Sequence, residues 1–171
     1  NNQKVVVSAY PTIIEELKAL IKKTNVEYKN YDEPLDFSAP TVAISPFAPQ
    51  GAALWLQIPN ISLGVGMNRG TPKTEIATAV KSFLDEYELG MWQVGSVSSF
   101  EAKMDETGLL EYCDEIRIKP KFFKKEDINS LQNVFSPSKA SEFFGIKGVA
   151  EPSAILGSKY KELFIKKRVY G

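Results

Sequence analysis

Short apolar runs and one helical stripe make up the first sixty residues. Residues 5–9, 26–31 and 41–44 predict short strands, since each is an apolar or alternating run. Apolar side chains at helical spacing predict a helix with one stripe facing a core, at Ile13, Ile14, Leu17, Leu20 and Ile21. Prolines then interrupt residues 45–59, although a short extended segment fits within 52–58. We therefore expect a small β-α-β-like region over residues 1–60, with a domain boundary near residue 60.

From residue 61 onward, short strands alternate with short helices. The apolar runs predict strands at residues 61–65, 92–97, 116–118 and 163–169. Amphipathic or capped segments predict helices at residues 72–87, 105–113, 125–131, 136–145 and 149–156. This alternation predicts a layered α/β fold over residues 61–171, with a mainly parallel or mixed sheet.

Composition restricts the chemistry. The 21 basic and 21 acidic side chains balance, which argues against nucleic-acid binding because such a surface needs a basic excess. One cysteine, Cys113, and no histidine exclude an internal disulfide, a histidine-activated nucleophile and the usual zinc sites. We therefore expect a cytoplasmic protein without metal or cofactor. Acidic neighbours at residues 114 and 115 should raise the pKa of Cys113.

Neither the longest apolar stretch nor the start of the chain predicts membrane contact or export. Residues 51–56 are far too few to span a bilayer, and no charged-then-apolar secretory segment opens the chain. The chain begins Asn-Asn-Gln-Lys without a methionine. We therefore expect a further N-terminal piece of the protein to precede it.

A glycine-rich loop between a predicted strand and helix is the most distinctive candidate site. Residues 64–72 read GVGMNRGTP, so the third glycine comes one place later than in a dinucleotide fingerprint, and no acidic residue ends the next strand. A dinucleotide site is therefore disfavoured. Thr71 suits a helix N-cap, Pro72 suits the first helical position, and Arg69 can pair bidentately with a carboxylate or phosphate. The residues leave an anion site and a plain tight turn as equal alternatives.

Polar residues also gather after the predicted strand at 92–97. Ser98 stands past the strand end, where open α/β sheets usually place their ligands. Four charged residues follow it closely, namely Glu101, Lys103, Asp105 and Glu106. Carboxylates beside a lysine can supply general acid–base groups if partly buried. For Asp105 and Glu106 the simpler alternative is a favourable charge at a helix N-terminus.

Two later segments are weaker candidates for anion binding. Ser136 and Ser138 begin a predicted helix, where their hydroxyls can cap the helix or bind an anion. Lys166, Lys167 and Arg168 lie on a predicted strand, where such a run is ordinarily a solvated edge that blocks strand pairing. Several candidate anion sites on one sheet suggest a ligand with several carboxylates or phosphates.

Four segments in order resemble a known family: SLGVGMNRGTPKTEI, SVSSFEAKMDETGLL, FSPSKASEFFGIKGVAEPSAIL and KKRVYG. They are similar to the C-terminal domain shared by the cobalamin-biosynthesis proteins CbiG and CobE, over roughly residues 61–171. Residues 1–60 resemble the central region of CbiG in position and character. The resemblance implies a three-layer α/β/α sandwich with a mixed sheet.

The resemblance also implies a function in the anaerobic pathway of cobalamin (vitamin B12) biosynthesis. CbiG is the cobalt-precorrin-5A hydrolase, which opens a δ-lactone on the macrocycle and releases acetaldehyde. Its polycarboxylated substrate would bind at Gly64, Gly66, Arg69, Gly70, Thr71, Ser98, Lys103, Ser136, Ser138 and Lys167. Without histidine, the base that activates water would be a carboxylate of raised pKa, Glu106 or Glu101.

Departures from the family pattern keep other functions open. Met67 and Asn68 stand where the family loop usually has a cysteine and a basic residue, which removes a thiol role there. If the family's N-terminal domain holds the lactone-opening residues, this sequence, which lacks it, would not hydrolyse alone. The alternatives are a non-catalytic corrinoid-binding or carrier module like CobE, and an unrelated phosphate-binding domain. Further expected partners are other cobalamin-pathway enzymes and a second copy of the chain.

Overall fold

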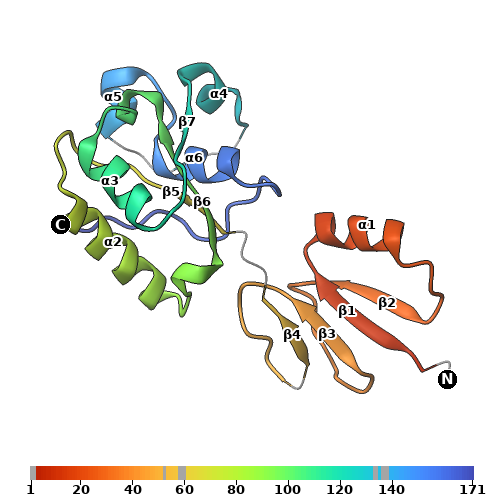
Figure 1. Cartoon of the computed structure of the whole chain (residues 1–171). Helices are drawn as coiled ribbons and strands as arrows, with labels where there is room; N and C mark the ends of the chain where they lie inside the picture. The colour runs from red at the N-terminus through yellow and green to blue at the C-terminus, as the bar shows by residue number, and fades with distance from the viewer. Residues whose placement is uncertain (1–2, 52, 58–60, 133–134, 136–138) are drawn as a thin grey trace. The chain divides into compact units, whose positions relative to one another are not determined.

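The computed structural model describes residues 3–51, 53–57, 61–132, 135 and 139–171. The chain divides into two compact units, residues 1–59 and residues 60–171. The chain trace in Figure 1 follows both units from the N-terminus to the C-terminus.

The first unit is a four-stranded sheet with one helix. Its elements are β1 (Val5–Ala9), α1 (Pro11–Leu20), β2 (Val26–Asn30), β3 (Thr41–Ile44) and β4 (Leu54–Leu56). The strand order is β2-β1-β3-β4, and every described pairing is parallel. The strands expected at residues 5–9, 26–31 and 41–44 and the extended segment within 52–58 are thus confirmed. The apolar run of β1 is buried along most of its length because β1 lies inside the sheet.

The apolar stripe of α1 is shorter than its sequence pattern predicts. Ile13 and Ile14 are buried, whereas Leu20 is 78% exposed. The helix ends at Leu20 because Ile21 already has extended backbone angles. The expectation that Leu20 faces the core is therefore wrong.

The second unit is a three-stranded sheet flanked by helices. Its strands are β5 (Ile61–Gly64), β6 (Val94–Phe100) and β7 (Lys121–Phe123), in the order β5-β6-β7. Its α-helices are α2 (Lys73–Glu86), α3 (Thr107–Glu115), α4 (Lys125–Ser130), α5 (Lys139–Phe144) and α6 (Ala150–Gly157). Short 3₁₀ turns, η1 (Met91–Gln93) and η2 (Glu101–Lys103), flank β6. The α/β class is confirmed.

The described strand pairings are parallel, whereas the resemblance implied a mixed sheet. The physical reason is connectivity: α2 lies between β5 and β6 along the chain, and α3 lies between β6 and β7. In Figure 1, α2 and α3 lie on one side of these strands and α6 lies on the other. Helices therefore cover both faces of the sheet.

Strand β6 shows the two faces most clearly. Phe100 packs with Ile128, Ile146 and Val149 in a buried cluster on one face. Ser96 precedes Phe100 in the strand and lies on the same face, because side chains alternate between the faces. Its hydroxyl donates a hydrogen bond to the carbonyl of Gly157 in α6. Val97 points the opposite way and is fully buried. The side facing α6 is therefore polar in the middle of the strand and apolar at its end.

Two glycines allow α6 to lie directly against the sheet. A Cβ added at Gly64 would lie 1.7 Å from the carbonyl oxygen of Ala150. A Cβ added at Gly157 would lie 2.1 Å from Oγ of Ser98. The absence of a side chain at Gly64 therefore serves helix packing.

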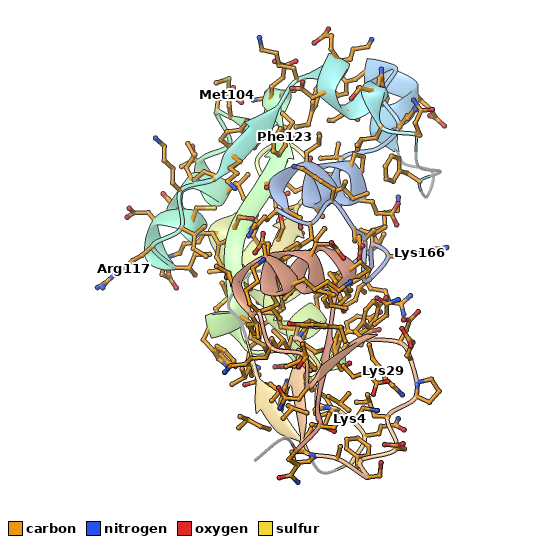
Figure 2. The ribbon with its side chains drawn as sticks, turned by 90° about the vertical axis from the view of Figure 1, so that its right-hand side faces the viewer. Lys4, Lys29, Met104, Arg117, Phe123 and Lys166 are labelled. Carbon is orange, nitrogen blue, oxygen red and sulfur yellow. The ribbon has the colours of Figure 1, made fainter. Side chains whose placement is uncertain are left out.

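Two predicted strands do not form. Residues 116–118 end α3: Arg117 adopts φ 56°, and the Ile118 N–H donates to the Cys113 carbonyl at 3.0 Å, as in a Schellman turn. Figure 2 shows the side chain of Arg117 pointing away from the rest of the unit. The third strand is instead β7, which begins at Lys121.

Residues 163–169 are also not a strand. Val169 is 87% exposed, and Lys166 points away from the unit in Figure 2. Contacts with side chains hold this segment, in place of the hydrogen bonds of a strand pairing. The Lys167 N–H donates to Glu151 Oε1 at 3.1 Å, and Arg168 pairs with Glu86 at 3.1 Å. The strand expected at 92–97 is shifted: it begins at Val94, after the 3₁₀ turn η1.

No helix in the described part of the chain is both long enough and apolar enough to cross a membrane.

Candidate functional site

A hollow of about 390 Å³ lies beyond the carboxyl ends of β5 and β6. It is lined by residues 69–73, which lead from β5 into α2, and by residues 105–108 and Glu111, which lead from β6 into α3. Parallel α/β sheets bind their ligands at this edge, where loops from neighbouring strands meet. The hollow is therefore the candidate site.

The hollow forms because the starts of α2 and α3 touch. A Cβ added at Gly108, in the first turn of α3, would lie 2.2 Å from the carbonyl oxygen of Thr71. Gly108 thus allows the two helix starts to approach at backbone distance. The loop residues that precede each helix are brought together as a consequence.

Glu106 is the anion that the glycine-rich loop binds. Its side chain is only 5% exposed, and its Oε2 accepts the Gly70 N–H at 2.8 Å. Its Oε1 accepts a hydrogen bond from Lys103 Nζ at 3.2 Å and lies 3.6 Å from Arg69 Nε. Glu106 occupies the N-cap position of α3 yet makes no side-chain cap there. Its carboxylate instead ties the loop after β5 to the loop after β6.

This environment lowers the pKa of Glu106. The Gly70 N–H is the largest cause, and the Lys103 and Arg69 charges add to it, while burial acts in the opposite direction. The expectation that Glu106 has a raised pKa is therefore wrong, and its role as the base stays a prediction. A buried carboxylate keeps its charge when a backbone donor and a cation both contact it.

Arg69 makes a two-point contact with Asp105. Its Nη1 donates to Oδ2 at 2.9 Å and its Nη2 donates to Oδ1 at 3.2 Å. The same Nη2 donates to the carbonyl of Ala102 at 3.2 Å. The hydrogen bond and charge of Arg69 hold the pKa of Asp105 below its usual value. Both side chains are 64% exposed, so the pair stands at the surface.

Lys73, the other lysine or arginine lining the hollow in the described residues, has an acidic partner as well. Its Nζ lies 2.6 Å from Oε2 of Glu115 at the end of α3. The lining thus contains two cations, Arg69 and Lys73, and the carboxylates of Asp105, Glu106 and Glu111.

Residues 61–171 match the protein family described as "Cobalamin synthesis G C-terminus" (CbiG_C). The chain belongs to this family.

Curated relatives and a solved structure agree with that family. The chain is 31% identical over 111 residues to a cobalt-precorrin-5A hydrolase of Priestia megaterium, a match that covers 65% of this chain and 30% of the relative. It is 32% identical over 103 residues to a probable cobalt-precorrin-5A hydrolase of Methanocaldococcus jannaschii, covering 58% and 32%. The chain spans about a third of the length of these relatives.

The solved structure is that of CobE, a protein from the cobalamin (vitamin B12) biosynthetic pathway. It is 25% identical, with a TM-score of 0.52, and the likeness covers 58% of this chain and 72% of CobE. The α/β architecture found here is thus shared with a cobalamin-pathway protein.

Within this CbiG_C domain, four of the residues expected at the site line the hollow: Arg69, Gly70, Thr71 and Glu106. The expected N-cap role of Thr71 is wrong, because Pro72 occupies that position and the Thr71 hydroxyl donates to the Asn68 carbonyl at 2.9 Å. The reason is that α2 begins one residue later than its Thr-Pro pattern predicts.

Other expected residues do not line the hollow. Lys103 supports it through Glu106. Glu101 accepts the Lys125 N–H at 3.3 Å, at the start of α4. Gly66 lies against α6, since an added Cβ would meet Val149 at 3.3 Å. Ser98 is fully buried beneath α6 and does not face the hollow.

Lys167, Ser136 and Ser138 are the remaining expected residues. Lys167 belongs to the C-terminal segment beside Glu151, and its backbone makes that contact. Ser136 and Ser138 lie outside the described residues. The structure therefore brings together the loops after β5 and β6, and it does not bring Lys167 to them.

The sequence pattern does not reveal the roles of Asp105, Lys73 and Gly108. For Asp105 it predicts an acid–base group or a favourable charge at a helix start, whereas the carboxylate pairs with a residue 36 positions away. An anion loop with an arginine is a signal to look for an acidic partner within the chain itself. Nothing in one sequence says which of its 21 acidic residues that partner is.

Cys113 and the described acidic residues offer no metal site. Among the described residues, no group of three or more histidine, cysteine, aspartate or glutamate side chains is arranged to hold a metal ion. Burial raises the pKa of the Cys113 thiol to about 11. The expected direction is confirmed, but the cause is burial and not the acidic neighbours.

Proposed function

We propose that this chain is the C-terminal part of a cobalt-precorrin-5A hydrolase of anaerobic cobalamin biosynthesis. We further propose that its hollow binds carboxylates at the edge of the corrinoid substrate. The observation that carries the proposal is the guanidinium of Arg69, which stands exposed at the hollow within a domain of the CbiG_C family. Such a planar fork matches the geometry of a carboxylate.

The proposed reaction opens a δ-lactone on the macrocycle and releases acetaldehyde. Lactone hydrolysis needs an activated water and donors for the developing oxyanion. Glu106 is poorly suited as the base, since its lowered pKa makes it a weak proton acceptor. We assign Glu106 to positioning the loop, and Glu101 stays a predicted base. In this proposal the unit from residue 60 chiefly binds and orients the substrate, with residues 1–60 as the central region of CbiG.

A second candidate function is a non-catalytic corrinoid-binding or carrier module. The observation that favours it is that Asp105 and Glu106, the carboxylates nearest Arg69, are both held ionised by hydrogen-bond donors. Carboxylates held ionised in this way are weak proton acceptors, which favours binding over catalysis. Contact with other cobalamin-pathway enzymes and self-association stay predictions for either function.

Incubation with cobalt-precorrin-5A separates these functions. Release of acetaldehyde supports the hydrolase, whereas a shifted corrinoid absorption spectrum without acetaldehyde supports the carrier module. Tight nucleotide binding together with indifference to the corrinoid would refute both.

Two arginine variants test where the corrinoid binds. Arg69→Gln should weaken binding by about tenfold or more, because it removes a charge-assisted two-point contact. Arg117→Gln is the matched control, since Arg117 is exposed on the turn that follows α3. Equal affinities for the two variants would refute the assignment of the hollow.

A further inference from the structure

We propose that Asp105 is a built-in stand-in for a ligand carboxylate: it occupies the Arg69 fork in the free chain and leaves when a polycarboxylate binds the hollow. This inference rests on the proposed function, and it names Asp105 as the residue that makes the hollow select ligands with several carboxylates.

The first argument is the shape of the contact. A carboxylate held by both Nη atoms of Arg69 is the arrangement that a ligand carboxylate would make, and here Asp105 makes it at 2.9 and 3.2 Å. The same guanidinium also donates a hydrogen bond to the Ala102 carbonyl, and its Nε lies 3.6 Å from Oε1 of Glu106. Arg69 therefore keeps these partners when Asp105 departs, and its fork becomes free for the ligand.

The second argument is the contrast between the two neighbouring carboxylates. The Glu106 side chain is 5% exposed and bonded to the Gly70 backbone and Lys103, so its departure would open the loop. The Asp105 side chain is 64% exposed, and its partner is as exposed as it is. An exposed ion pair contributes little net stability, so Asp105 can be exchanged at small cost.

The third argument is charge. The lining of the hollow contains two cations, Arg69 and Lys73, and the carboxylates of Asp105, Glu106 and Glu111, so acidic groups outnumber cations there. An additional anion is therefore repelled unless a carboxylate of the chain withdraws. Exchange of Asp105 for a ligand carboxylate leaves the charge around Arg69 unchanged.

Selectivity follows from effective concentration. Asp105 is attached to the chain, so it competes with a free monocarboxylate at an advantage. A ligand anchored by one carboxylate presents its others at a comparable local concentration and can displace Asp105. Lys73, paired with the exposed Glu115, offers the second anchoring point.

The test compares Asp105→Asn with Glu111→Gln. Both remove one exposed negative charge from the lining of the hollow. Arg69 pairs with Asp105 and Glu106 but not with Glu111, so Glu111→Gln controls for general electrostatics. The probes are acetate, citrate and uroporphyrin, a tetrapyrrole with acetate and propionate side chains. Isothermal titration calorimetry measures the affinities of every variant, and NMR follows the Nε–H signal of Arg69 in the variants that keep this residue.

Asp105→Asn should tighten acetate and citrate binding by about two- to fivefold, the range set by an exposed ion pair. It should also reduce the ratio of the citrate affinity to the acetate affinity. Glu111→Gln should change both affinities less and leave the preference intact. In an Arg69→Gln background, the gain from Asp105→Asn should fall to that of Glu111→Gln, as a double-mutant cycle requires for a direct contact.

Equal effects of Asp105→Asn and Glu111→Gln, or a gain that persists without Arg69, would overturn the inference. Asp105→Ser is a second variant that removes the carboxylate, and thermal unfolding confirms that each variant is folded. If citrate shows the expected pattern while cobalt-precorrin-5A and uroporphyrin do not bind, the proposed function fails and this inference stands. If the corrinoid binds without that pattern, the inference alone fails.

Discussion

The backbone N–H of Gly70 donates a 2.8 Å hydrogen bond to Oε2 of Glu106, which lies 36 residues further along the chain. A loop that reads as a cradle for an external anion thus holds a carboxylate of its own chain. The bond ties the carboxyl ends of β5 and β6 together and leaves Arg69 at the surface. Gly70 therefore binds an anion of its own chain and has a structural role, whereas Arg69 is the residue proposed to bind a ligand.

Replacement of Glu106 should destabilise the CbiG_C domain. Glu106→Ala removes the acceptor for the Gly70 N–H and leaves Lys103, whose side chain is only 14% exposed, without this partner. We expect a loss of about 2 kcal/mol in the free energy of unfolding in urea. Glu111→Ala, on the exposed side of α3, is the control and should stay within about 0.5 kcal/mol of the unchanged chain. A similar small loss for both variants would contradict the assignment.

The pH dependence of unfolding should also report Glu106. Its pKa in the folded chain is lowered from 4.5, chiefly by the Gly70 N–H, so the folded state binds this proton less readily than the unfolded state. The resulting stabilisation is complete above pH 4.5 and is lost as the pH falls through the lower folded value. Urea unfolding across this range should show a flatter acid limb for Glu106→Gln. Parallel limbs for the two proteins would rule out a lowered pKa at this residue.

The glycines of the 64–72 loop should differ in their tolerance of a side chain. Gly64→Ala places a Cβ 1.7 Å from the Ala150 carbonyl, so α6 must move away from β5, and we expect a loss of about 3 kcal/mol. A Cβ at Gly70 meets nothing within 4 Å, and only its φ of 76° opposes a side chain, at a cost of about 1 kcal/mol. Chemical denaturation measures both. A Gly70→Ala variant less stable than Gly64→Ala would be inconsistent with this packing.

The thiol of Cys113 should be unreactive in the folded protein. It is 1% exposed, and burial raises its pKa to about 11, so thiolate is scarce at mildly alkaline pH. Labelling with a chromogenic disulfide should therefore proceed at the rate of opening of the domain, and guanidinium-unfolded protein, the control, should react at once. Immediate labelling of the folded protein would show that Cys113 is accessible.

The sequence was sufficient for most of the elements, because their signals are local. The β-branched run of β1 and the apolar stripe of α2 can each be recognised within one short stretch of sequence, and both elements formed as expected. The strand expected at 116–118 failed for a local reason that sequence hides: Arg117 takes the left-handed position that glycine usually fills. The strand expected at 163–169 failed because its contacts, with Glu86 and Glu151, are distant in sequence.

The amino-acid sequence by itself determined the α/β class, the lack of histidine chemistry and the four motifs of the CbiG_C family. It also placed glycines and Arg69 where a strand passes into a helix. Only the tertiary structure decided which anions these groups meet. Contacts such as Gly70 with Glu106 and Arg69 with Asp105 depend on β5 and β6 pairing side by side and on Gly108 letting α3 approach α2. Contacts between residues 36 positions apart depend on how the elements pack, and no local sequence pattern encodes that packing.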